Sequence, residues 1–171
     1  MNVYHKSAFH HPWYNPLQNQ WNRDNWHSHW NPRYHQPTNR DYGSQPFVVN
    51  INQATKQNNA FRTALWTGEH FQVTLMSIPV GEDIGLEVHP TTDQFIRLEE
   101  GQGLVRMGNS KDQVDFEQMV YDDDAVMVPA GKWHNIINTG TKPLKVYVIY
   151  APPEHPFGTV HPTKASAEGH R

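Results

Sequence analysis

Residues 81–101 read GEDIGLEVHPTTDQFIRLEEG, a stretch that combines polar side chains with turn-forming residues. Glu87 and His89 stand two residues apart on a run that is predicted to be a strand, so their side chains point to the same face. Turn-forming residues follow, and Gln94 then opens a second apolar run. A hairpin over this stretch places a carboxylate, an imidazole and an amide on one sheet face. All three groups are types that bind metal ions.

A second stretch, residues 123–138, reads DDAVMVPAGKWHNIIN. A short apolar strand here runs into a Pro-x-Gly turn, and His134 begins the next predicted strand. Pro129 and Gly131 change the direction of the chain at a corner of a barrel, which gives the His134 side chain a defined direction. The sequence therefore offers a second imidazole, on a separate strand, as a fourth candidate ligand.

From residue 47 to residue 151 the pattern is almost entirely that of β structure. Residues 47–51 are predicted as a strand, and residues 52–57 as a short helical turn capped by Asn52. Gly, Asn, Asp and Pro residues separate the short apolar runs that follow. Many short strands at this spacing predict an antiparallel barrel or sandwich. The predicted strands are 61–67, 70–79, 84–89, 94–100, 103–108, 113–120, 124–129, 133–138 and 144–150.

Composition limits the functions that are open to the chain. Its 171 residues suffice for one ordinary domain. The formal net charge of −3 does not suggest a nucleic-acid partner, and no apolar run is long enough to cross a membrane. Cysteine is absent, which excludes disulfides and thiolate metal sites. The N-terminus lacks the apolar core of a secretory signal, so we expect a cytoplasmic protein.

The two ends of the chain differ from this central region. Residues 1–46 contain six of the twelve His and four of the six Trp, and prolines interrupt every periodic pattern. We expect a disordered arm, which is either a solvated tail or an adhesive segment that stacks on other chains. The adhesive alternative suits a layered assembly such as a bacterial spore coat. Residues 152–171 follow the last strand and are expected to form a polar C-terminal arm, because prolines stop the strand.

The two informative stretches together resemble the motifs of the cupin superfamily. The first family motif is Gly, five residues, His-x-His, three or four residues, Glu, six residues, Gly, and residues 81–101 match its spacing. The second is Gly, five residues, Pro-x-Gly, two residues, His, three residues, Asn, and residues 123–138 match it. Residues 152–161 are also similar to the ends of some small bacterial single-domain cupins. The resemblance implies an all-β fold, a double-stranded β-helix or jelly-roll barrel, over residues 47–151.

The chain departs from the family pattern at three positions. Glu87 stands where the family has its first His, and Gln94 stands where it has Glu. The resemblance implies a metal site of Glu87, His89, Gln94 and His134, and the two changes together leave its ligand charge at −1. Such a mixture of nitrogen and oxygen ligands suits a divalent ion of Zn, Mn, Fe, Ni or Co. At the third position Asp123 replaces Gly, and Asp tolerates the left-handed conformation of a turn.

A different interpretation of the four candidate residues needs no metal. Glu87 and His89 then form an ion pair at the mouth of the barrel, Gln94 is hydrogen-bonded, and His134 is a packed residue of a lost site. The matching spacing of both motifs favours metal binding over this alternative.

Other polar residues give weaker signals. Arg97 and Arg106 are candidates for an anionic substrate, but strand alternation makes Arg97 face away from Gln94, so a solvated or ion-paired role is expected. His155 and His161 have no partner at ligand spacing, and we expect surface or packing roles for them.

The sequence therefore predicts a metal-binding cupin that acts on an unidentified small molecule, as an oxygenase or an isomerase does. It assigns no catalytic residue and indicates neither the substrate nor the metal. The alternative function is a non-catalytic structural or assembly protein that attaches through residues 1–46. A homodimer is expected by analogy with small cupins, and neither nucleic acid nor a membrane is expected as a partner.

Overall fold

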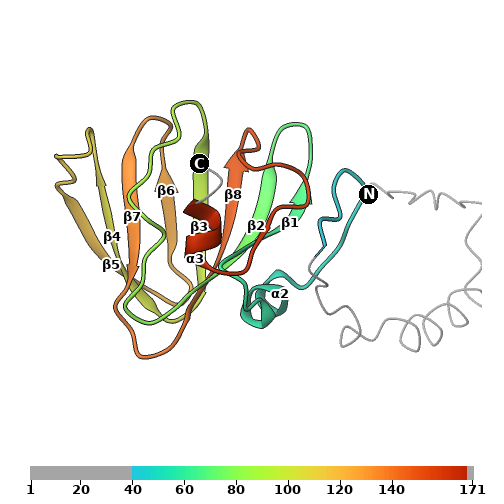
Figure 1. Cartoon of the computed structure of the whole chain (residues 1–171), viewed down its shortest axis with the longest axis horizontal. Helices are drawn as coiled ribbons and strands as arrows, with labels where there is room; N and C mark the ends of the chain where they lie inside the picture. The colour runs from blue at the N-terminus through green and yellow to red at the C-terminus, as the bar shows by residue number, and fades with distance from the viewer. Residues whose placement is uncertain (1–39, 169–171) are drawn as a thin grey trace, which may run out of the picture. The chain divides into compact units, whose positions relative to one another are not determined.

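The computed structural model describes residues 40–168. Most of the expected N-terminal arm, residues 1–39, and residues 169–171 lie outside the described residues. The described chain forms two antiparallel sheets, which confirms the all-β jelly-roll fold (Figure 1). Within the same residues, no helix is long and apolar enough to cross a membrane.

The larger sheet has six strands, and several neighbours in it are far apart in the sequence. In spatial order they are β6 (Ala125–Val128), β3 (Asp93–Glu100), β8 (Leu144–Ala151), β2 (Gln72–Ile78), β1 (Arg62–Thr67) and β9 (Val160–His161). β3 pairs with β6 on one side and with β8 on the other, which places Gln94 between Val128 and Tyr150.

The smaller sheet has three strands, with the order β5 (Phe116–Tyr121), β4 (Gln102–Gly108) and β7 (Trp133–Asn138). Figure 1 shows these strands at one side of the barrel, and β8, β2 and β1 at the other. The turn before β6 contains Asp123, whose φ of 70° confirms the left-handed conformation expected there.

Aliphatic side chains from both sheets fill much of the space between them. Ile96 and Leu98 on β3 meet Ile136 on β7 and Val146 on β8 in one cluster, and each is at most 1% exposed. Burying a side chain of this size contributes about 1.5–3 kcal/mol to folding. This cluster is the apolar core of the barrel.

A second apolar cluster covers the opposite face of the larger sheet. Helix α2 (Ile51–Gln57) packs Ala54 against Leu65 on β1 and Leu75 on β2. The partly buried Phe47 stacks on Tyr42, with 4.2 Å between the ring centroids, and both pack against this cluster.

The start of α2 corrects two sequence-based expectations. Asn50 is the cap, because its side chain accepts a hydrogen bond from the backbone nitrogen of Gln53 at 3.0 Å. The prediction of a strand over residues 47–51 is therefore wrong, and so is the prediction of Asn52 as the cap. Val and Ile residues favoured a strand locally, but the Asn50 cap begins a helix at Ile51.

Both ends of the described chain are fixed to the barrel. Asp41 is 4% exposed, and its carboxylate accepts hydrogen bonds from the Thr67 hydroxyl at 2.5 Å and from the Gly158 backbone nitrogen at 3.0 Å. The segment after Pro153 returns along the sheet, where β9 pairs with β1, and it ends in the short helix α3 (Lys164–Glu168). Parts of both expected arms thus pack against the sheets.

Candidate metal centre

The segment that carries Glu87 and His89 is not a regular strand. Residues 84–89, predicted as half of a hairpin, make one isolated bridge to the smaller sheet, at Glu87, and Asp83 just before them makes another. Gly85 has a φ of 87° and donates its backbone N–H to Asp83 Oδ1 at 2.7 Å, so the chain curls just before Glu87. The predicted hairpin with the following strand is therefore wrong, because β3 pairs with β6 and β8 instead.

Backbone hydrogen bonds hold Glu87 opposite His134. The nitrogen of each residue donates to the carbonyl oxygen of the other, at 3.0 and 2.9 Å. The predicted turn over Pro129–Gly131 precedes His134, and Gly131 adopts a φ of 78° that a residue without a Cβ atom accepts readily. The Gly131 nitrogen donates to the His89 carbonyl at 2.8 Å. One turn therefore fixes both segments that carry an imidazole.

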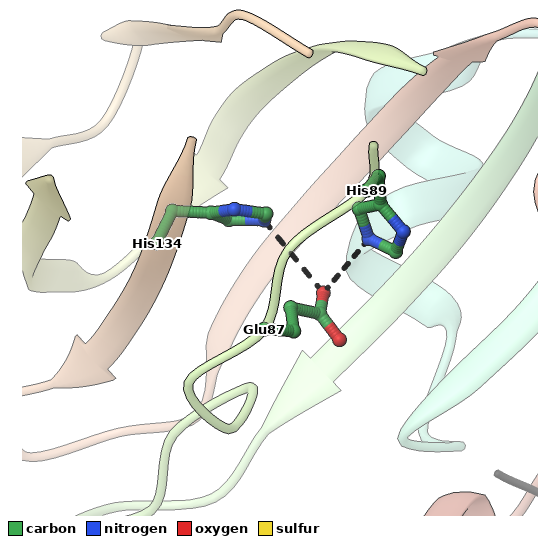
Figure 2. A group of neighbouring side chains, drawn as sticks. All are labelled: Glu87, His89 and His134. Atoms are coloured by element: carbon green, nitrogen blue, oxygen red, sulfur yellow. Dashed lines mark hydrogen bonds and ion pairs between the residues drawn. The ribbon is translucent and has the colours of Figure 1, made fainter. Parts of the chain in front are cut away.

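The three side chains converge on one buried point, and Figure 2 shows the Glu87 carboxylate between the two imidazoles. Glu87 Oε1 lies 3.4 Å from His89 Nε2 and 3.7 Å from His134 Nε2. One ligand atom from each residue lies within 4.8 Å of the other two, and no residue of the three is more than 8% exposed. Donor atoms that share one ion at about 2.1 Å lie roughly 3–3.5 Å apart, so the spacing fits a metal site.

Gln94 reaches the same point from the larger sheet. It is 4% exposed, and its Nε2 lies 3.0 Å from His134 Nε2. A half-turn of the amide would present Oε1, the atom through which an amide binds a metal. The structure thus brings together all four residues that the sequence singled out, from β3, from β7 and from the irregular segment between β2 and β3.

The outer ring nitrogens of both imidazoles have acceptors. His134 Nδ1 lies 3.0 Å from the carbonyl oxygen of Lys132, and His89 Nδ1 lies 3.0 Å from Glu154 Oε1. Each acceptor receives a hydrogen bond from the Nδ1–H group, so a ring that is neutral directs the lone pair of Nε2 into the cluster. Histidines that bind metals almost always have this second hydrogen bond.

Glu154 is a neighbour of the candidate site that the sequence did not reveal. Its other oxygen accepts a hydrogen bond from the Thr92 hydroxyl at 2.9 Å, so the carboxylate is held from two sides. It belongs to the segment that was expected to form a polar arm, and only the return of that segment along the sheet brings it to His89. The Pro-Pro-Glu sequence by itself carries no signal of this contact.

The pKa values follow from burial and from the neighbouring charges. Burial raises the pKa of Glu87, but the hydrogen bond from His89 and the charge of Arg62 hold it below its ordinary value. Burial lowers the pKa of His89, and the carboxylates of Glu87 and Glu154 more than reverse that effect. Burial lowers the pKa of His134. At neutral pH Glu87 is therefore charged and the His134 ring is neutral.

A cavity of about 930 Å³ adjoins the cluster. Its walls are formed by residues 86–89, by Trp133, by Arg62 on β1 and by the returning C-terminal segment. Gln72 anchors that segment: its Nε2 donates to the carbonyl of His155 at 2.9 Å, and its Oε1 accepts from the His155 nitrogen at 3.0 Å. The volume suits a small-molecule ligand.

The other candidate residues take two kinds of position. Arg97 forms the expected ion pairs, with Glu99 at 3.1 Å and Asp123 at 2.7 Å. His155 and His161, which were expected in surface or packing roles, line the cavity instead. Sequence spacing could not place them there, because the wall exists only after residues 154–162 return to β1.

Comparison with known proteins agrees with the motifs and the fold. A family model described as the cupin domain matches residues 74–150. An uncharacterised protein of Bacillus subtilis strain 168, YrkC, is 71% identical over 128 residues, which are 75% of this chain and 69% of that protein. An uncharacterised protein of Acanthamoeba polyphaga mimivirus, L612, is 37% identical over 127 residues, which are 74% of this chain and 78% of that protein.

A crystal structure of a protein from Bacillus halodurans extends this similarity to three dimensions. It matches with a TM-score of 0.75 and 64% sequence identity, over 76% of this chain and 98% of that chain.

Proposed function

This chain belongs to the cupin family, and from that premise we propose that it holds one divalent metal ion and acts on a small molecule beside that ion. One observation carries the proposal. The Nε2 atoms of His89 and His134 converge with Glu87 Oε1, while the Nδ1 atoms of both rings are engaged elsewhere. Two imidazoles and one carboxylate are a ligand set common to catalytic metal sites.

The interpretation without a metal accounts less well for His134. Its Nδ1–H donates to Lys132 and its ring is neutral, so Nε2 is an acceptor that faces the Glu87 carboxylate at 3.7 Å. Two electron-rich atoms in a buried site repel each other unless a proton or a cation lies near both. The amide of Gln94 relieves the His134 side of this conflict, and the His89 ring relieves the Glu87 side, but neither group lies between the two atoms. A divalent ion satisfies both atoms at once.

The ligand set determines what the bound ion would do. Glu87, His89 and His134 would hold it, and Gln94 would turn its Oε1 toward it as a fourth ligand. Zn, Mn, Fe, Ni and Co ions all suit this mixture of nitrogen and oxygen atoms. The ion would supply a Lewis-acid or redox centre, as in an isomerase or an oxygenase. Glu154 orients His89, and the adjoining cavity admits the small molecule.

Elemental analysis of untagged protein tests the metal site. We expect about one divalent ion per chain in the wild type, and close to none in Glu87→Ala and His134→Ala. Glu117→Ala is the matched control, because Glu117 is a carboxylate on the exposed surface in a pair with Arg106. Wild-type protein that takes up no stoichiometric ion after reconstitution would contradict the proposal.

A substrate screen with the ion that co-purifies tests catalysis. Oxygenase and isomerase substrates are offered to the wild type and to the two variants that lose the ion. Turnover is expected only in the metal-loaded wild type and in the Glu117→Ala control. Equal turnover in protein without metal would refute a metal-dependent reaction while leaving the binding result unaffected.

A further inference from the structure

Arg62 carries a buried charge and is not one of the proposed metal ligands. It lies on β1, is 3% exposed and lines the cavity beside the three ligand residues. Removing a guanidinium group from water is costly unless hydrogen bonds and a counter-charge replace the water. The Arg62 Nε atom is buried and has no hydrogen-bond partner among the described residues. The Arg62 Nε–H group is therefore a buried donor that a bound molecule could pair with.

In the other two arginines on strands, Arg97 and Arg106, the Nε–H group donates a hydrogen bond to a carboxylate. Arg97 Nε donates to Glu99 at 3.1 Å, and Arg106 Nε donates to Glu117 at 2.7 Å. Arg62 contacts the sulfur of Met76 through Nη2 at 4.0 Å, and a thioether is a weak acceptor. The Arg62 side chain also hydrogen-bonds the Tyr150 hydroxyl. Of the three arginines it is the most buried, and its Nε is the one without an acceptor.

A second atom of the cavity wall has the same property. His155 Nε2 is buried and has no hydrogen-bond partner within residues 40–168. The ring is held in place, since it packs edge-on against Tyr150 with 5.0 Å between centroids, and Gln72 binds its backbone. Burial and the charge of Arg62 lower the pKa of His155 to about 3, so the ring is neutral. A neutral imidazole can present an N–H group at Nε2.

The charges of the cavity favour an anion. Apart from its imidazoles, the ionisable residues that line it are Arg62, Glu87 and Glu154. A divalent ion among the ligand residues adds two positive charges, so the loaded cavity carries a net charge of about +1. One negative charge on the bound molecule balances it, and the low dielectric of a buried site makes that balance favourable.

We propose that Arg62 and His155 bind a carboxylate group of the small molecule and hold the rest of that molecule beside the metal ligands. This inference rests on the proposed function, because it takes the cavity to be the substrate site. Arg62 supplies the charge and its Nε–H, and His155 supplies one further N–H. A carboxylate fits better than a phosphate group, which brings about two negative charges at neutral pH to a cavity with a single surplus charge.

Nuclear magnetic resonance of protein with ¹⁵N-labelled arginine tests this contact directly. Metal-loaded and metal-free samples are titrated with sodium benzoate, with benzamide and with inorganic phosphate. Benzamide is the matched control probe, because it has the shape of benzoate without the charge. We expect benzoate to shift the Arg62 Nε–H resonance, which is assigned by its absence in Arg62→Lys. The Nε–H resonance of Arg106 stays unchanged, since that group already donates a hydrogen bond to Glu117.

Calorimetry with the same probes measures what Arg62 contributes. Arg62→Gln should weaken benzoate binding by about 10–100-fold, the range expected for a hydrogen bond to a charged group. Arg106→Gln should leave benzoate binding unchanged, and thermal unfolding of each variant confirms that the fold is kept. If Arg62→Gln does not fold, the wild-type resonance shift alone decides.

The outcomes separate this inference from the proposed function. Benzoate binding that is equal in Arg62→Gln and the wild type overturns the carboxylate site, and so does the absence of benzoate binding or a preference for phosphate or benzamide. Stoichiometric metal with any of these results leaves the proposed function standing. Arg62-dependent benzoate binding in a protein that takes up no metal supports the carboxylate site and contradicts the metal centre.

Discussion

One face of strand β7 carries two regions of opposite character. His134 and Ile136 stand two residues apart on it, both point into the barrel, and both are 1% exposed. Ile136 belongs to the apolar core, whereas His134 lies among Glu87, His89 and Gln94. The same alternation of side chains along β7 thus supplies an apolar core residue at one position and a candidate metal ligand two positions away.

The difference shows how burial is used in this fold. An apolar side chain gains free energy simply by leaving water. A buried polar side chain gains little in net terms, because its new hydrogen bonds mainly replace those it made with water. The apolar region is therefore expected to determine stability, and the polar region to determine what is bound. Four substitutions test that division, from the largest expected effect to the smallest.

Ile136→Ala should lower the free energy of unfolding by about 2–5 kcal/mol, because it removes aliphatic contacts and leaves a cavity in the core. The metal content per folded chain should not change. Urea denaturation of metal-free protein measures the loss, and Ile136→Val is the control, with an expected loss of about 0.5–1.5 kcal/mol. A variant that keeps its stability but loses its metal would reverse the roles assigned to the two regions.

The polar region was predictable where its signal is local. Glu87, His89, Gln94 and His134 stand at fixed spacings beside turns, and Asp123 stands at the one position where a left-handed residue was expected. These signals depend on only a few neighbouring residues. The prediction that the four side chains meet was therefore correct, even though the segment of Glu87 and His89 is a curled chain and not the predicted strand.

The residues that the sequence did not reveal depend on contacts between distant parts of the chain. Arg62 and His155 line one cavity only because residues 154–162 return along β1, where β9 pairs with it. No periodicity or motif records that return, and the prolines before it suggested an arm. Gln72 is another such residue: it reads as an ordinary strand position, yet its fully buried amide anchors the returning segment.

Glu154→Gln should weaken metal binding by about 10–100-fold while stability without metal changes little. The amide still accepts a hydrogen bond from His89, but it lacks the charge that makes the imidazole a stronger ligand. Competition with a chelator measures the affinity, and Glu117→Gln is the control carboxylate. Unchanged affinity in Glu154→Gln would show that the contact with His89 does not support the metal site.

His155→Phe should change how stability depends on pH. The folded pKa of His155 is about 3, below its ordinary 6.5, so the unfolded chain takes up the proton first as the pH falls. The stability that the neutral ring contributes is present above pH 6.5 and is lost as the pH falls toward 3. Between pH 7 and pH 5 that loss amounts to about 2 kcal/mol.

The measurement compares unfolding of metal-free wild type and variant at these two pH values. The fall in stability should be smaller in His155→Phe by about 2 kcal/mol. His70→Phe is the control, since the His70 side chain is 86% exposed, and it should follow the wild type. Parallel curves for His155→Phe and the wild type would mean that His155 is not kept neutral by its position on the cavity wall.

Arg106→Gln should have the smallest effect, because it removes a polar contact that was never buried. The Arg106 and Glu117 side chains are 41% and 50% exposed, and an exposed ion pair contributes about 0.2–1 kcal/mol. Urea denaturation at low and high salt measures the change, which should shrink as salt screens the pair. A loss comparable to that of Ile136→Ala would break the comparison, since stability would then depend on surface charge as much as on the apolar core. A small loss would show that burial is the property that separates Arg106 from Arg62. An exposed arginine can then be replaced at little cost, whereas the buried Arg62 is the one proposed to bind a carboxylate.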